Sequence, residues 1–135
     1  MKDSLKPGLE HRVTHVVDDD RAIRFMGDEL RVYATPSIVE DLEYGCRDFL
    51  LQHLDEGEDS VGARVEIEHL RPTPMGFTAE HRISIEAIDG RRVRFRVEVR
   101  DGIETVARAI HDRFVVRIER LQAAIAAKLA QGSGG

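Results

Sequence analysis

ATPSIVEDLEYGCRDFLLQHL (residues 34–54) decides the fold, because it is the one long amphipathic helix that the sequence predicts among strands. Thr35 is a good N-cap, and Pro36 suits the first helical position. At 100° per residue the apolar side chains fall on one arc. They are Ile38, Val39, Leu42, Cys46, Phe49 and Leu50. Such a helix needs an apolar surface on which to bury that arc.

The next stretch, VGARVEIEHLRPTPMG (residues 61–76), has the alternation of a half-buried strand. Val61, Ala63, Val65 and Ile67 point to one face, with charged residues between the last three. Continuing the count places His69 on the same buried face. An imidazole among core positions is a candidate for chemistry, although a lone histidine there is more often a hydrogen-bonded core residue.

The remaining elements are strands joined by tight turns. Residues 12–17, 76–88, 91–100 and 103–116 read as strands, with Asp-Gly turns at 89–90 and 101–102. The arginines of the third of these strands alternate with apolar residues, as expected for a solvated face. Residues 18–34 read as an irregular loop or lid, and residues 117–130 read as a second helix. The order predicts an α+β domain over residues 1–130 with a flexible tail at 131–135. One helix cannot cover such a sheet fully, so we expect a homodimer.

Composition excludes several classes of function. The 135 residues have a net charge of −5, which argues against a nucleic-acid partner. Cys46 is the only cysteine and the six histidines lack ligand spacing, so we expect no disulfide, metal or other cofactor. The sequence contains no apolar run of membrane-spanning length and no signal-peptide core, which favours the cytoplasm.

At this point the chain resembles the fluoroacetyl-CoA thioesterase-like branch of the hotdog-fold thioesterases. The resemblance covers about residues 10–118 and rests on AT before the helix, Glu43 eight residues after Thr35, and Gly62 and His69 seven apart in SVGARVEIEHLRPTPMG. HDRFVV (residues 111–116) is a weaker match. The resemblance implies a hotdog fold, with an antiparallel sheet wrapped around the long helix. It also implies a catalytic set of Thr35, Glu43 and His69, with Gly62 beside the thioester.

The chemistry agrees with this assignment. Thioester hydrolysis needs a nucleophile or base, a general acid, and a donor for the developing oxyanion. Glu43 is suited to attack the thioester or to deprotonate water, and His69 is suited to acid–base work near neutral pH. The hydroxyl of Thr35 is suited to orienting either group. A backbone N–H near Gly62 or at the helix N-terminus is suited to binding the oxyanion.

Structural explanations stand beside each of these roles. Glu43 has Arg47 one turn on, as in an i,i+4 ion pair, and Gly62 suits a bulge or kink. Thr35 is explained by capping alone. Eight residues of helix span about 12 Å, so Thr35 and Glu43 meet only through substrate or water, or across a dimer interface.

Other polar positions receive structural interpretations. His81 faces inward without a motif match and is taken as structural, and Cys46 as a small core residue. His111 and Arg113 are within reach of a pantetheine or phosphate, but a solvated strand explains them better.

The sequence therefore predicts a homodimeric, cytoplasmic acyl-CoA thioesterase whose pocket lies at the dimer interface. The alternative is a non-catalytic hotdog module that binds an acyl-CoA or another small apolar ligand. A third reading is an enoyl-thioester hydratase, which the motif disfavours because all four matched positions belong to thioesterases.

Overall fold

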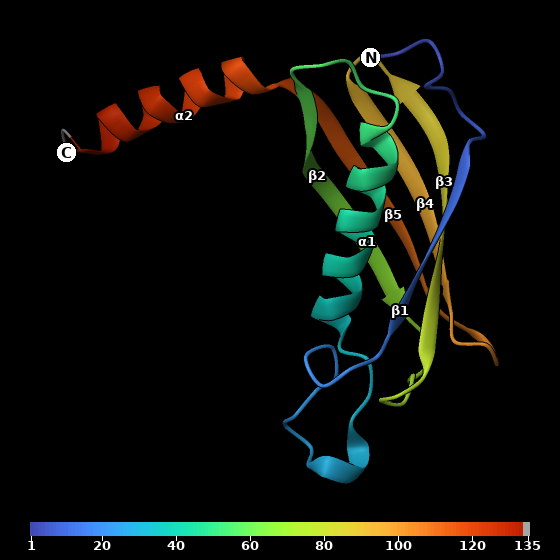
Figure 1. Cartoon of the computed structure of the whole chain (residues 1–135). Coiled ribbons are helices and arrows are strands. Elements are labelled where there is room, and N and C mark those ends of the chain that lie inside the picture. Colours follow the sequence, from blue (N-terminus) through green and yellow to red (C-terminus); the bar gives the residue numbers. More distant parts are fainter. Residues whose placement is uncertain (134–135) are drawn as a thin grey trace.

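A computed structural model, described here for residues 1–133, consists of an antiparallel sheet curved around one helix (Figure 1). The first half of the chain contains β1 (Glu10–Val16), the 3₁₀ turn η1 (Asp28–Leu30) and α1 (Thr35–Leu51). The second half contains β2 (Glu58–His69), β3 (Thr78–Asp89), β4 (Arg92–Arg100), β5 (Thr105–Arg117) and α2 (Ile118–Ser133). The α+β architecture expected from the sequence is confirmed.

The five strands lie in the order β1-β3-β4-β5-β2, and every pairing is antiparallel. The tight turns predicted at 89–90 and 101–102 connect β3 to β4 and β4 to β5. Gly90 and Gly102 have positive φ values there, which glycine adopts without strain. β1 and β2 form the two edges. β2 bonds only to β5 within the described chain, so its outer edge is free for another strand.

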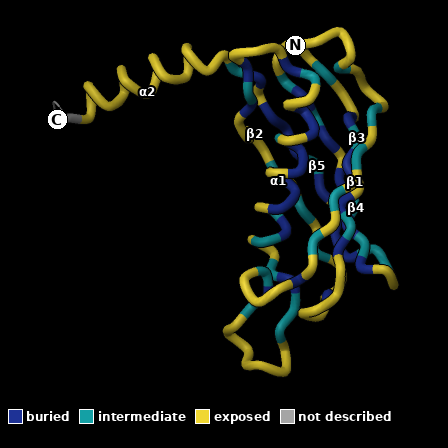
Figure 2. Tube along the Cα trace, viewed as in Figure 1, coloured by how far each residue is buried: buried dark blue, intermediate teal, exposed yellow. Residues whose placement is uncertain are grey.

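The core lies between α1 and the inner face of the sheet (Figure 2). The expected arc of α1 is buried except for Val39, which is half-buried. It packs on alternate residues of β4, where Val93, Phe95, Val97 and Val99 are at most 1% exposed. The arginines between them face the other way, which confirms that the basic run is the outer face of a strand.

The start of α1 differs by one residue from the expectation. Ala34 is the N-cap residue and no side chain caps the helix, so Thr35 and Pro36 already belong to its first turn. The prediction that Thr35 caps the helix was therefore wrong. Its hydroxyl is free for another partner, and the first N–H groups of α1 remain available to an anion.

Residues 18–34 form the expected irregular loop between β1 and α1. It projects beyond the N-terminal end of α1 (Figure 1). It carries exposed apolar side chains, among them Phe25 at 81%. Hydrogen bonds from Arg31 to the Asp19 and Ala22 backbone oxygens, together with a bridge between Ala22 and Tyr33, hold its two limbs together.

α2 follows β5 directly and projects away from the sheet (Figure 1). It extends to Ser133, so residues 131–133 of the expected tail are helical, and residues 134–135 lie outside the described part of the chain. Within residues 1–133, no helix is both long and apolar enough to cross a membrane.

Candidate active site

A β-bulge in β2 determines which of its side chains face the helix. The register with β5 shifts between Gly62 and Arg64, because Ala63 is an extra residue there. Before the bulge the even positions face α1, and after it the odd positions do. Gly62 and His69 are seven apart, an odd spacing that a regular strand would send to opposite faces. The bulge brings both to the helix side.

The same bulge overturns part of the sequence prediction. Val61 and Ala63 were expected on the buried face, but both are exposed. Val61 pairs with Phe114 on the outer face of the sheet. The prediction holds for Val65, Ile67 and His69, which follow the inserted residue.

Thr35 and His69 meet at the N-terminal end of α1. Thr35 Oγ1 lies 2.7 Å from His69 Nδ1, a hydrogen bond between residues 34 apart in the chain. His69 Nε2 is buried and has no hydrogen-bond partner within residues 1–133. Burial lowers the pKa of His69 from its ordinary value, so the ring is neutral at pH 7 and able to accept a proton. A buried nitrogen without a partner is a place where a substrate or water atom can bind.

Glu43 extends from the middle of α1 toward Gly62. A Cβ added at Gly62 would lie 2.5 Å from Glu43 Oε1, closer than any real contact, and 3.4 Å from His111 Cε1. A side chain at position 62 would therefore displace the Glu43 carboxylate from its place. Arg47 does not pair with Glu43 as the structural reading supposed. It binds Asp59 instead, with Nε 3.0 Å from Oδ1.

Arg113 on β5 is the charged partner of Glu43. Its Nη1 lies 3.6 Å from Glu43 Oε1, and the side chain is only 5% exposed. Nε donates to Ser60 Oγ at 2.7 Å and Nη2 to the Ser60 carbonyl at 2.9 Å. These bonds fix the guanidinium on the Glu43 side of the sheet and place a permanent positive charge beside the carboxylate.

His111 forms a hydrogen bond with Arg113 and so helps to orient its guanidinium. Because a guanidinium only donates, His111 Nε2 accepts from Arg113 Nη1 at 3.2 Å, and Nδ1–H donates to the Arg64 carbonyl at 2.8 Å. Burial, and then the nearby Arg113 charge, lower the pKa of His111. The reading of His111 and Arg113 as a solvated strand was therefore wrong, since both face the core.

The described chain forms two groups of candidate residues. One is Thr35 with His69, and the other is Glu43 with Gly62 and Arg113. Within residues 1–133 no hydrogen bond or ion pair links Glu43 to Thr35 or His69. A hollow of about 470 Å³ opens at the second group, bounded also by Tyr44, Arg47, Asp59 and Ser60.

A further buried polar network fixes the segment just before Thr35. The Tyr33 hydroxyl donates to Asp41, and His81 Nε2–H donates to the Tyr33 oxygen at 3.0 Å. Arg21 Nε binds Asp41 at 2.8 Å. Burial lowers the pKa of His81 to about 4. The network ties the loop, α1 and β3 together, as expected if His81 has a structural role. Cys46 is likewise buried, and burial raises the pKa of its thiol.

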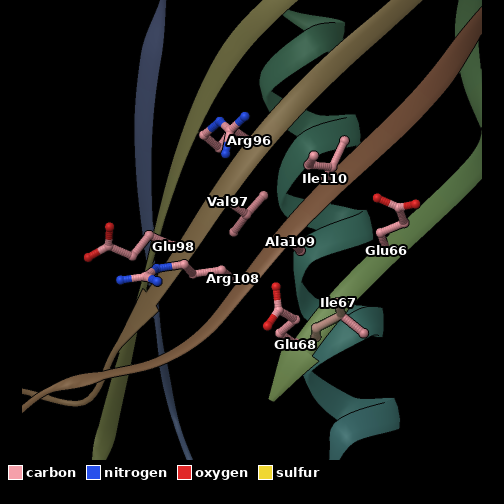
Figure 3. A pocket seen from close by; sticks show the side chains of 9 residues that line it. All are labelled: Glu66, Ile67, Glu68, Arg96, Val97, Glu98, Arg108, Ala109 and Ile110. Carbon is pink, nitrogen blue, oxygen red and sulfur yellow. The ribbon is translucent and has the colours of Figure 1, made fainter. Parts of the chain in front are cut away.

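Another hollow lies on the opposite face of the sheet, over β2, β4 and β5 (Figure 3). Its rim is charged, with Glu98 and Arg108 prominent in the view. None of the four residues from the motif lines it. The candidate chemistry therefore belongs to the helix side.

Comparisons with known proteins agree with the fold and identify the family. A model of the fluoroacetyl-CoA-specific thioesterase family matches residues 16–119. The chain is 29% identical to the fluoroacetyl-CoA thioesterase of Streptantibioticus cattleyicolor over 141 residues, which cover 98% of this chain and 100% of that protein.

Solved structures give the same result. A structure of the fluoroacetyl-CoA thioesterase FlK has a TM-score of 0.83 at 26% identity, covering 93% of this chain and 98% of that one. A thioesterase superfamily member from Thermus thermophilus has a TM-score of 0.88 at 25% identity, covering 98% and 99%. A hot-dog-like protein from Thermanaerovibrio acidaminovorans has a TM-score of 0.84 at 23% identity, covering 90% and 91%. The hotdog fold expected from the sequence is confirmed.

Proposed function

Because this chain belongs to the fluoroacetyl-CoA-specific thioesterase family, we propose that Thr35, Glu43 and His69 hydrolyse an acyl-CoA with Gly62 beside the thioester. Family membership makes the protein a hotdog thioester hydrolase. The observation that carries the residue assignment is the Thr35–His69 hydrogen bond of 2.7 Å. It joins two motif residues from distant parts of the chain and leaves the buried Nε2 of His69 free for the reacting groups.

The reaction divides between the two groups of residues. Glu43 attacks the thioester carbonyl or deprotonates a water, and the guanidinium of Arg113 lies 3.6 Å from its carboxylate. Neutral His69 takes up and returns a proton, and Thr35 holds its ring in one orientation. The uncapped N-terminus of α1 lies beside Thr35 and offers N–H groups to the developing oxyanion. CoA then leaves as its thiol with the proton that His69 returns. Where Glu43 is the nucleophile, its attack gives a mixed anhydride, and water hydrolyses that anhydride to release the acid and regenerate the carboxylate.

We further propose that the protein is a homodimer and that each site is shared. Thr35 and Glu43 lie about 12 Å apart along α1, too far for both to reach one carbonyl. The free edge of β2 and the hollow beside Glu43 both support pairing with a second copy. In this arrangement Thr35 and His69 of one copy act with the partner's Glu43. A cytoplasmic location is consistent with a CoA ester as substrate.

The first test measures thiol release from acyl-CoAs of increasing chain length, with the wild type and with His69→Ala. Turnover of at least one ester, lost in the variant, supports the proposal and identifies the acyl group. Binding of CoA esters without turnover by the wild type would instead favour a non-catalytic ligand-binding module.

A mixed dimer tests the shared site. Glu43→Gln and His69→Ala are each expected to be inactive, and both are coexpressed in one cell. If the site is shared, half of the dimers are mixed and each has one complete site, so roughly a quarter of wild-type activity returns. Activity that stays at the level of the single variants would place each site within one chain.

A further inference from the structure

α2 carries an apolar stripe that its own chain does not cover. Ile118, Leu121, Ile125 and Leu129 recur at helical spacing and are 42%, 36%, 51% and 67% exposed. The helix leaves the body of the molecule after β5 and stands clear of the sheet (Figure 1). Four large apolar side chains in a row on a helix are an interaction surface rather than scattered exposure.

The second uncovered apolar surface lies at the opposite end of the molecule. Phe25, Met26 and Leu30, in the loop before α1, are 81%, 53% and 56% exposed. We name these three residues the loop tip. It lies beyond the N-terminal end of α1, whereas α2 departs near the C-terminal end of that helix (Figure 1). The loop tip and α2 of one chain therefore do not meet.

The free edge of β2 runs between these two ends. α2 starts beside the beginning of β2, where the Ile118 N–H donates to the Gly57 carbonyl at 2.9 Å. The other end of β2 is His69, which bonds Thr35 at the foot of the loop. When two copies pair antiparallel along this edge, the beginning of β2 in one copy lies beside the end of β2 in its partner.

We propose that the α2 stripe of each copy packs on the loop tip of its partner. The inference rests on the homodimer proposed above and specifies a contact within it. Antiparallel pairing directs α2 toward the partner's loop end, and two-fold symmetry makes the contact twice. A helix of 16 residues is about 24 Å long. That length is roughly five times the distance between neighbouring strands of a sheet. α2 is therefore long enough to extend past the paired β2 strands and reach the partner's loop.

Charge supports the same pairing. Residues 18–34 contain five acidic and three basic side chains, so the loop is net negative. Arg117 and α2 together contain three basic side chains and one acidic one, so this segment is net positive. Opposite net charges around two apolar surfaces favour their association over the pairing of two α2 helices. Because the loop leads into Thr35, the contact also lies next to the partner's candidate site.

Cysteine cross-linking tests the contact. Met26→Cys and Ile125→Cys chains with different tags are coexpressed, and the purified mixed dimers are oxidised. A covalent dimer containing one chain of each kind is expected. Ala127→Cys, which replaces a small residue on the other side of α2, is the matched control and should not cross-link with Met26→Cys. Cys46 is buried and does not interfere.

Leu121→Glu tests the contact by affinity. Because it places a charge in the proposed apolar interface, the dimer dissociation constant should rise about tenfold or more, with the melting curve of the monomer unchanged. Sedimentation of the wild type shows whether the protein is a dimer, and so tests the homodimer separately from the α2 contact. If the wild type is a dimer but Met26→Cys and Ile125→Cys do not cross-link, the α2 contact alone is overturned. Cross-links only between two Ile125→Cys chains would overturn it in the same way. A wild-type monomer would overturn the homodimer and the α2 contact together.

Discussion

Replacing Gly62 by alanine should reduce activity without reducing stability. The added Cβ would meet Glu43 Oε1 at 2.5 Å, and ordinary contact begins at 3.4 Å, so the carboxylate must retreat by about 0.9 Å. Gly62 does not have a positive φ, so the backbone accepts alanine without strain. The whole effect of the substitution therefore falls on the position of the Glu43 carboxylate.

The two magnitudes follow from that displacement. A shift of about 1 Å in a catalytic group reduces kcat/KM by roughly 100-fold. Alanine in place of glycine within a strand adds about 0.5–1 kcal/mol of stability. Weakening the Glu43–Arg113 pair offsets part of this gain, but only slightly because the Glu43 side chain is 46% exposed. We expect an unchanged or slightly higher melting temperature together with the large loss of activity.

Thiol release gives kcat/KM for Gly62→Ala, and thermal melting gives its stability. The control is the same substitution in a Glu43→Ala background, where the obstructed carboxylate is absent and no further loss of rate is expected. Full activity in Gly62→Ala would refute the reasoning, because Glu43 would then work equally well from the displaced position. A protein that is both inactive and strongly destabilised would also refute it, since Gly62 would then serve the fold.

Three further changes test the rest of the site. Thr35→Val removes one hydroxyl at nearly constant volume and should reduce kcat roughly 10- to 100-fold in the thiol-release assay, whereas Thr35→Ser, which keeps the bond to His69, should retain most activity. Arg113→Met removes a buried cation that is hydrogen-bonded to Ser60 and His111, and should reduce the free energy of unfolding in urea by about 2–4 kcal/mol. His81 has a folded pKa of about 4 against an unfolded 6.5, so the unfolded chain binds more protons and stability should fall as the pH drops from 6.5 toward 4. His81→Phe should flatten that slope in urea melts at several pH values, leaving the part that the lowered pKa values of His69 and His111 contribute; an unchanged slope would contradict the assignment.

The sequence was sufficient for the elements because local periodicity determines them. The arc of α1 and the alternation in β4 each require one apolar surface, and both are buried as predicted. Thr35, Glu43 and His69 were implied by a resemblance to the fluoroacetyl-CoA thioesterase-like family, which rests on their order and spacing. The Thr35–His69 bond connects two of them, but their catalytic roles stay a prediction.

What the sequence could not indicate depends on contacts between distant strands. The bulge at Ala63 leaves no signal in the alternation, so Val61 was assigned to the wrong face. Arg113 was misread because an arginine suggests solvent, and because the alternate positions of β5, such as Ile110 and Phe114, are also apolar in the sequence. Only the structure shows that Arg113 and His111 share the buried face of Val115. The hydrogen bond to Ser60 that compensates the burial of Arg113 is likewise visible only there.

The bulge explains why the spacing between Gly62 and His69 carries information. In a regular strand an odd separation places two residues on opposite faces, so a spacing of seven would leave only one of Gly62 and His69 on the helix side of the sheet. One inserted residue restores the common face. Directly beside the inserted residue, the Arg64 carbonyl accepts from His111 Nδ1 at 2.8 Å, and His111 Nε2 in turn accepts from Arg113 at 3.2 Å. The bulge that aligns Gly62 with His69 thus also orients the cation beside Glu43, so the two groups of candidate residues depend on one irregularity of β2.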